Sequence, residues 1–330
     1  MTINYLDSKR LQGLSADTKP TNVQTNSLFE QTDNSIRYWY DGNNWMNNPT
    51  RGVFMGGSGT NVMDYVTIAT TGNATDFGDL SGGFDQTSGS SSDVRGLVHG
   101  GYVSSANVNT IEYITIATTG NATDFGDRTI SARGTAGLST ITRSVMGGGY
   151  AASLQNVMDY VTIATTGNAI DFGDFTLSRY LMAGLNSAAG RGVFGGGHNG
   201  DAAWYNTMDY ITIATTGNAT DFGDLTVARG NNGGLNSDVR GVFGGGTSPS
   251  NSNVMDYITI ATTGNATDFG DLIVAGGGAS CGVNSITRGM FAGQSTTNID
   301  YITIATTGNA IDFGDLTTSR VNSGGVQNGI

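Results

Sequence analysis

The stretch MDYITIATTGNATDFGDL, from Met208 to Leu225, has close copies throughout the chain, and six copies can be counted. Each copy contains an acid followed by Tyr, a run of Thr and Ile, a Gly-Asn turn and a DFGD segment. The acid-Tyr pairs are Asp64-Tyr65, Glu112-Tyr113, Asp159-Tyr160, Asp209-Tyr210, Asp256-Tyr257 and Asp300-Tyr301, and their spacings are 48, 47, 50, 47 and 44 residues. Such a regular period indicates a repeat architecture in which every unit folds alike.

Each repeat offers four short segments that are rich in strand-forming residues and separated by Gly, Asn and Ser turns. Upstream of the Tyr lies a second anchor, which reads RGVFMGG from Arg51, RGLVHGG from Arg95, RSVMGGG from Arg143, RGVFGGG from Arg191, RGVFGGG from Arg240 and RGMFAGQ from Arg288. Before most of these anchors stands a Gly-rich piece such as GLNS. Helical apolar spacing is missing, so the sequence predicts an all-β chain whose blades form a six-bladed β-propeller.

The order of the segments predicts how the ring closes. The array begins at Arg51 with the second strand of a blade and ends at Gly324–Gln327 with a piece that resembles a first strand. We therefore expect the C-terminal strand to be the inner strand of the blade that contains Val53 and Phe54. On this basis the chain divides into residues 1–50, a leader with an aromatic hairpin, and residues 51–330, the propeller.

From Arg51 onward the repeats resemble the kelch repeat, in which a hydrophobic strand ends in a double Gly and a Tyr follows after a variable loop. The resemblance implies the same six-bladed fold. The sequence departs from the kelch pattern on the outer strand, where that family usually has Trp. The residues found there are Phe77, Phe125, Phe172, Phe222, Phe269 and Phe313.

Composition restricts the classes of partner. The 330 residues carry a net charge of -12, and three acids in each of six repeats account for eighteen of the 27 acidic residues. The 15 basic residues form no cluster, so we expect no nucleic-acid binding. No signal peptide is evident and no run of about 18 apolar residues occurs, so we expect synthesis in the cytoplasm and no membrane insertion. The single Cys281 predicts a small buried residue and no disulfide within the chain.

The repeated DFG does not indicate a kinase, because it occurs six times in a chain whose only lysines are Lys9 and Lys19. We expect the aspartates to be structural, to accept backbone N–H groups and to pair with the Arg that opens each second strand. Calcium binding in the GNATDFGD turns is the alternative, since carboxylates and Asn carbonyls are hard oxygen ligands. The prediction is that the protein needs no metal and no cofactor.

Enzyme classes that use this fold also fit poorly. Kelch-type oxidases need a copper site built from His and Tyr with a modified Cys, whereas this chain has two histidines, His99 and His198, about a hundred residues apart. Sialidase-like propellers need an Arg cluster, but here the arginines recur once per blade. We expect no catalytic residues, although aspartate pairs leave a glycan-processing enzyme as a remaining alternative.

The loops after the Gly runs vary while the strands are nearly copied, and variable loops on a rigid scaffold usually carry binding. The longest loop holds Trp204 and Tyr205 next to His198, and neighbouring loops hold Tyr102 and Tyr150. Aromatic rings suit stacking on sugars or docking on proteins. We predict that these five residues form the ligand site, with Trp204 and Tyr205 exposed at a loop tip; packing against the blade edge is the alternative.

The segment from Asn26 to Asn48 alternates aromatic and polar residues and predicts a hairpin that carries Tyr38, Trp39, Tyr40 and Trp45. It resembles aromatic hairpin modules near the N-termini of bacteriophage tail and fibre proteins. This resemblance implies a virion structural protein of the tail-fibre type that attaches to other virion proteins through this segment. Its propeller would then bind a glycan or protein of the host surface, and assembly as a homotrimer is a hypothesis. The alternatives are a decoration or scaffold protein without a receptor and a cellular kelch-type interaction module.

Overall fold

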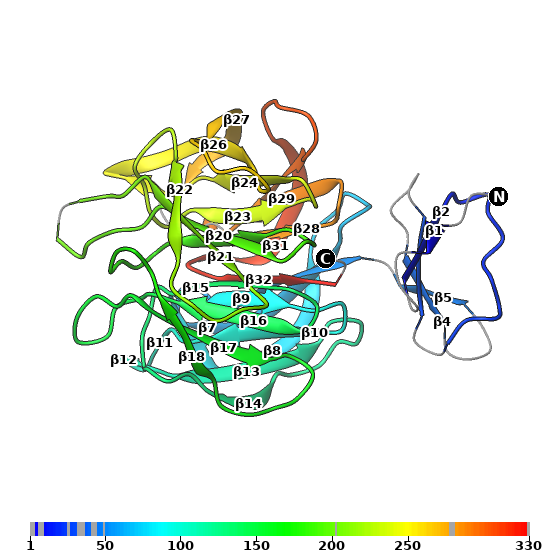
Figure 1. The fold of residues 1–330 in the computed structure, drawn as a ribbon, viewed down its shortest axis with the longest axis horizontal. Helices are drawn as coiled ribbons and strands as arrows, with labels where there is room; N and C mark the ends of the chain where they lie inside the picture. The colour runs from blue at the N-terminus through cyan, green and yellow to red at the C-terminus, as the bar shows by residue number, and fades with distance from the viewer. Residues whose placement is uncertain are drawn as a thin grey trace.

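The computed structural model describes residues 4–5, 10–24, 27–31, 37–40, 45–48, 50–201, 203–276 and 281–328. Within these ranges the regular structure is entirely β, and no helix is present that could span a membrane. From residue 50 onward the strands form six antiparallel sheets arranged as the blades of a β-propeller (Figure 1). The fold class predicted from the repeats, an all-β six-bladed propeller, is therefore confirmed.

Every blade has four main strands, which follow one another from the propeller axis outward. Blade 1 contains β32 (Gly324–Gln327), β6 (Arg51–Met55), β7 (Thr60–Thr67) and β8 (Thr75–Phe84). Blade 2 contains β9 (Ser88–Ser91), β10 (Arg95–His99), β13 (Thr110–Thr115) and β14 (Thr123–Asp127). Blade 3 contains β15 (Ala136–Ser139), β16 (Arg143–Gly147), β17 (Val157–Thr162) and β18 (Ile170–Asp174).

Blades 4 to 6 repeat this order. Blade 4 contains β19 (Ala183–Asn186), β20 (Arg191–Gly195), β21 (Thr207–Thr212) and β22 (Thr220–Asp224). Blade 5 contains β23 (Gly233–Asn236), β24 (Arg240–Gly244), β26 (Ser250–Thr259) and β27 (Thr267–Gly276). Blade 6 contains β28 (Cys281–Asn284), β29 (Arg288–Ala292), β30 (Gln294–Thr303) and β31 (Ile311–Val321). Short extra strands in the loops are β11 (Tyr102–Val103), β12 (Ala106–Asn107) and β25 (Thr247–Ser248).

A separate five-stranded sheet precedes the propeller. Its strands, in spatial order, are β1 (Asn4–Tyr5), β2 (Arg10–Gly13), β3 (Leu28–Gln31), β4 (Arg37–Tyr40) and β5 (Trp45–Asn48). Strands β2 and β3 are parallel and the other pairs are antiparallel. The sequence predicted one hairpin in this region, whereas the chain builds a larger sheet. The predicted turns at residues 33–34 and 41–42, and the side chains of Trp39, Tyr40 and Trp45, lie outside what the structure describes.

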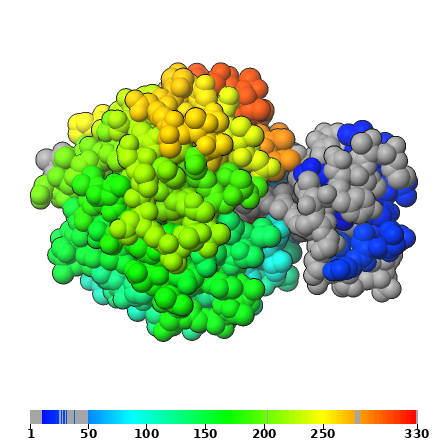
Figure 2. All heavy atoms as spheres, in the orientation of Figure 1, coloured from blue at the N-terminus to red at the C-terminus, as the bar shows by residue number. Residues whose placement is uncertain are grey.

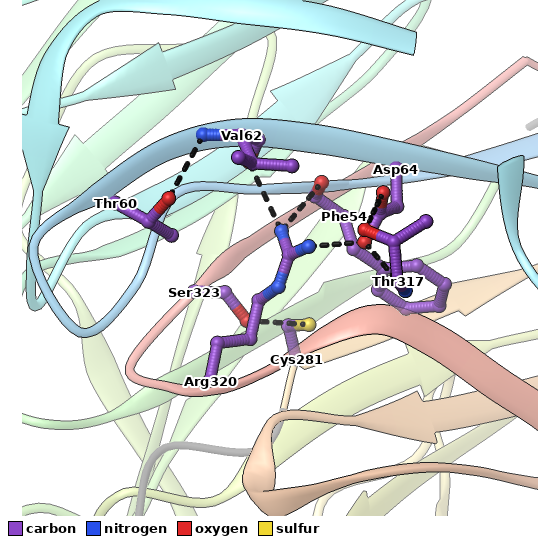
Figure 3. A network of polar contacts seen from close by, with 8 residues as sticks. All are labelled: Phe54, Thr60, Val62, Asp64, Cys281, Thr317, Arg320 and Ser323. Atoms are coloured by element: carbon purple, nitrogen blue, oxygen red, sulfur yellow. Dashed lines mark hydrogen bonds and ion pairs between the residues drawn. The ribbon is translucent and has the colours of Figure 1, made fainter. Parts of the chain in front are cut away.

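The C-terminal strand closes the ring. Strand β32 pairs antiparallel with β6, and its Val326, which is fully buried, lies opposite Val53. A second link comes from the end of β31, where Arg320 forms an ion pair with Asp64 of blade 1 and donates to the carbonyl of Val62 at 3.0 Å (Figure 3). The last blade is thus joined to the first by backbone pairing and by buried charge.

The apolar core lies between neighbouring blades. Phe54, Val66 and Ile68 of blade 1, for example, pack with Val283 and Met290 of blade 6. The repeated outer-strand Phe belongs to these clusters and contacts the repeated Tyr edge-on, as in the pair Tyr65–Phe77, whose ring centroids are 6.0 Å apart. On the face drawn in the space-filling view, the propeller residues form one continuous surface (Figure 2).

Glycine at the second position of every inner strand sets how closely the blades meet. A Cβ atom on Gly234 would lie 2.5 Å from the carbonyl oxygen of Gly184, and one on Gly184 would lie 2.4 Å from that of Gly137. The same contact continues around the axis, and the full ring of six is Gly89, Gly325, Gly282, Gly234, Gly184 and Gly137. No side chain fits at this radius, so the inner strands can taper to the axis.

The TTGN and DFGD segments together form the outer junction between blades. The N–H of Gly120 donates to the carbonyl of Phe77 at 2.8 Å, and the N–H of Asp79 donates to the side chain of Asn121 at 3.1 Å. Gly78 has φ +139°, and a Cβ on it would lie 2.5 Å from the carbonyl oxygen of Gly120, so this position requires glycine. All six junctions between blades repeat these contacts, which explains why the TTGN and DFGD segments recur almost unchanged in every repeat.

The predicted pairing of the turn aspartates with the Arg of the second strand is wrong. Arg191 instead lies over the ring of Tyr210, 4.7 Å from its centroid, and donates to the carbonyl of Ala261 in the next blade at 2.6 Å. The planar, permanently charged guanidinium can stack on a ring while its edge donates to carbonyls. This arrangement occurs in all six blades.

The arginines that do pair with aspartate stand elsewhere and are buried. Arg179 of blade 3 reaches the acid before Tyr210, with 2.9 Å between its Nη2 and Oδ2 of Asp209, and both side chains are fully buried. Equivalent pairs are Arg128–Asp159, Arg229–Asp256 and Arg320–Asp64. Such pairs link one blade to the next inside the core.

Candidate functional site

The inner strands surround an axial channel that encloses a cavity of about 100 Å³. One mouth is formed by the residues that enter the inner strands, among them Gln86, Gly134, Leu181 and Asn231. A row of backbone hydrogen bonds joins them across blades 2 to 5, since the N–H of Leu181 donates to Gly134 O at 2.7 Å and that of Asn231 donates to Leu181 O at 2.8 Å. The mouth is therefore a rigid rim that side chains from several blades can share.

The loops that carry the predicted ligand residues are tied to this rim by short two-residue bridges. Tyr150 pairs with Arg133, with hydrogen bonds of 3.2 and 2.8 Å, and His198 pairs with Tyr180, with bonds of 3.3 and 2.9 Å. Tyr102 is bridged in the same way to Asp85. The backbone of each of these ring residues is thus joined to a residue that directly precedes the channel mouth.

The rings form a continuous row across blades 2, 3 and 4. The guanidinium of Arg133 lies 4.7 Å from the centroid of Tyr102 and 5.4 Å from that of Tyr150. Tyr150 and Tyr180 are 5.9 Å apart by ring centroids. His198 then lies 5.7 Å from Tyr180 and 4.2 Å from Trp204. We call these six residues, Tyr102, Arg133, Tyr150, Tyr180, His198 and Trp204, the aromatic row.

The row is partly exposed, which leaves ring surface open to solvent. All members are half-buried except His198, which is 9 % exposed. Trp204 is not at an exposed loop tip as predicted, because it packs against His198 and approaches Gly230, where an added Cβ would lie 3.0 Å from the indole. Tyr205 is also half-buried, and the described ring contacts do not include it; its N–H donates to Gly197 O at 2.9 Å.

Four of the five predicted ligand residues are therefore brought together, and two members of the row were missed. Arg133 and Tyr180 lie between the variable loops, in the segments that lead into the inner strands. The sequence does mark these two residues, because the position that pairs with the variable loop differs from blade to blade. In blades 1 to 4 it is occupied by Asp85, Arg133, Tyr180 and Gly230. A comparison of these segments as well as the loops would have revealed them.

Burial determines the charge of the two histidines. Burial lowers the pKa of His198, and the nearby Asp201 opposes this, so the imidazole is neutral near pH 7 and can stack as an uncharged ring. His99 lies far inside blade 2, fully buried, with Ser88 at 3.0 Å from Nδ1 and Ser90 at 3.2 Å from Nε2. Burial, helped by Arg128, lowers its pKa to about 3. His99 is a packed core residue and does not join His198 in a site.

The chemistry available to the row is stacking and hydrogen bonding. Among the described residues no group of three or more His, Cys, Asp or Glu side chains is placed to hold a metal ion. Cys281 is buried, lies 3.1 Å from the hydroxyl of Ser323, and has its pKa raised to about 11 by burial, so the thiol is not ionised at neutral pH. Half-exposed rings beside one cation suit a ligand with flat apolar faces and polar edges.

Comparison with known proteins adds no relative: no protein-family model matches the chain and no curated protein matches its sequence.

Proposed function

We propose that this protein is a virion structural component of the tail-fibre type, without enzymatic activity, whose kelch-like propeller binds a host-surface glycan along the aromatic row. The observation that carries the binding proposal is the row itself, five aromatic or imidazole rings and one guanidinium over three blades, beside the channel mouth. Sugar rings stack on such surfaces through their C–H faces, while hydroxyl groups bind the polar edges.

A rigid base supports this proposal. The rim residues are joined by backbone hydrogen bonds, so the rings are positioned before a ligand arrives and little conformational entropy is lost on binding. A kelch-like identity is supported by the Gly run and the repeated Tyr. In the proposal, the five-stranded N-terminal sheet attaches the propeller to other virion proteins, and the fibre assembles as a homotrimer.

The test is retention of the full chain on an immobilised glycan array. Trp204→Ala should weaken binding by on the order of 2 kcal/mol, as truncation of a central aromatic residue often does. Because Trp204 packs on His198, the melting temperature must be measured for the same sample. Thr296→Ala, in the corresponding segment of blade 6, which lies in strand β30, is the control and should bind as the wild type does.

Two results would overturn the proposal. Unchanged retention of a folded Trp204→Ala variant would show that the row is not the contact. Absence of binding to every glycan by the wild type would favour a decoration protein whose rings only fix the loops to the rim.

A further inference from the structure

We propose that the ligand of the aromatic row is an acidic glycan, and that Arg133 binds its carboxylate. This inference rests on the proposed function, because it assigns a ligand class to the same site. It begins from the different use of the arginines in the propeller.

Ten of the eleven propeller arginines are committed to structural bonds. The Arg that opens each second strand donates to carbonyls of the next blade, as Arg191 does to Ala261. Arg51, Arg95, Arg143, Arg191, Arg240 and Arg288 form this group. Arg128, Arg179, Arg229 and Arg320 form the buried ion pairs. Only Arg133 remains.

Blade 2 makes its buried ion pair without Arg133. In blades 3 and 4 the pairing residue, Arg179 or Arg229, is the fifth after the last Asp of DFGD. In blade 2 that place holds Ala132, and Arg128, directly after the DFGD segment, reaches Asp159 instead. Arg133 is therefore an additional cation, one position further along, at the channel mouth.

The guanidinium of Arg133 is held in place but has unused donors. It lies between the rings of Tyr102 and Tyr150, at 4.7 and 5.4 Å from their centroids. Within the described part of the chain it has no ion pair and no side-chain hydrogen bond, and its Nε is buried without a partner. The Nη1 and Nη2 groups are not among the buried unpaired atoms, so they are open to a ligand.

These features favour a carboxylate over a neutral hydroxyl. A planar guanidinium can donate two parallel bonds to a carboxylate, and hydrogen bonds between charged groups are about twice as strong as neutral ones. His198 is neutral and adds no positive charge, so Arg133 is the one fixed cation of the row. Its central place between the Tyr rings would put the acid group of one sugar over Arg133 and neighbouring sugars over the rings.

The experiment compares acidic oligosaccharides with their methyl esters, which keep the sugar and the linkage but lose the charge. The probes are oligogalacturonate, oligomannuronate and a sialylated oligosaccharide, each as the free acid and as the ester, titrated calorimetrically into the full chain at low salt. The wild type should bind at least one acid about tenfold or more tightly than its ester. Added salt should reduce this preference.

Variants separate the roles of the residues. Arg133→Gln, which removes the charge and keeps a planar amide, should abolish the preference for the acid over the ester. Arg133→Lys should keep part of the preference, because it retains the charge without the paired donors. Trp204→Ala should weaken acid and ester alike.

The outcomes distinguish this inference from the proposed function. Equal binding of acid and ester by the wild type would overturn the acidic ligand and leave glycan binding intact. Loss of both forms in a folded Arg133→Gln variant would show that Arg133 only positions the rings. Absence of binding to all six probes, with retention on the glycan array, would overturn the acidic ligand and leave the proposed function intact.

Discussion

Arg179 of blade 3 and Asp209 of blade 4 form a fully buried ion pair, with 2.9 Å between Nη2 and Oδ2. Thr176 adds a hydrogen bond of 2.6 Å to the other carboxylate oxygen. The carboxylate lies directly before the repeated Tyr, so it ties the third strand of one blade to the segment that follows the outer strand of its neighbour. Blade 6 has the same acid, Asp300, but no arginine is paired with it in the described residues.

This difference predicts unequal effects of one substitution. Asp209→Asn should destabilise the protein by about 3–5 kcal/mol, because Arg179 would remain buried without its counter-charge. Asp300→Asn should cost less than about 1 kcal/mol, since burial already raises the pKa of Asp300 and disfavours its charged form. Chemical denaturation at pH 7 measures both, and equal losses would contradict the assigned role of the pair.

The glycine ring around the axis predicts a strong effect of one methyl group. Gly234→Ala would place Cβ 2.5 Å from the carbonyl oxygen of Gly184, so a strand must move, and we expect a loss of about 1–3 kcal/mol. Gly82→Ala is the control, because its nearest non-neighbouring atom would be 3.4 Å away, and it should change stability by about 0.5 kcal/mol or less. If both variants melt like the wild type, the close approach of neighbouring inner strands does not set their distance from the propeller axis.

Ring closure predicts that the C-terminal strand is required for stability. Deletion of Ser323–Ile330 removes the partner of β6 and the fully buried Val326. We expect a cost on the order of 5 kcal/mol, equivalent to roughly 10 °C in Tm, together with lower solubility from the exposed strand edge. Deletion of residues 329–330 alone is the control. An unchanged melting curve for the longer deletion would show that closure adds nothing.

His99 predicts a loss of stability in mild acid. Its folded pKa of about 3 lies below the ordinary value of 6.5, so below pH 6.5 the unfolded chain binds a proton that the folded chain does not. The contribution of neutral His99 to the free energy of unfolding is therefore fully present above about pH 6.5. It falls as the pH decreases, by about 2 kcal/mol between pH 7 and 5. His99→Gln should lack this component, and denaturation curves at both pH values test it; parallel losses in the two proteins would rule it out.

The repeated aspartate turns predict little dependence on calcium. Their positions are set by bonds within the protein, as where the N–H of Asp224 donates to Asn265 at 3.0 Å. Treatment with a calcium chelator should leave Tm nearly unchanged. A large fall in Tm that calcium reverses would mean that the turns bind the ion.

The sequence was sufficient for the repeat fold because nearly every strand carries its own copied signal. The inner strand of blade 2, Ser88–Ser91, was missed, since it lacks the GLNS pattern and keeps only Gly89 of the ring. The buried pair of Arg179 with Asp209 was also missed, because it joins residues thirty positions apart across a blade boundary. For the candidate site, the variable loop was enough to predict Trp204, whereas Arg133 required knowledge of which strand ends meet at the channel mouth.

The closing junction has a consequence for the chain ends. Blade 6 meets blade 1 through the contacts used at the other junctions, as when Gly72 N–H donates to Phe313 O at 2.9 Å and Arg288 donates to Ala69 O at 3.0 Å. The closing junction has the same kinds of contact as the other junctions, so these contacts do not dictate in which blade the polypeptide must start. Circularly permuted versions opened at another blade would retain the full set of junctions, and the rings at the mouth could diversify one blade at a time without altering how the blades meet.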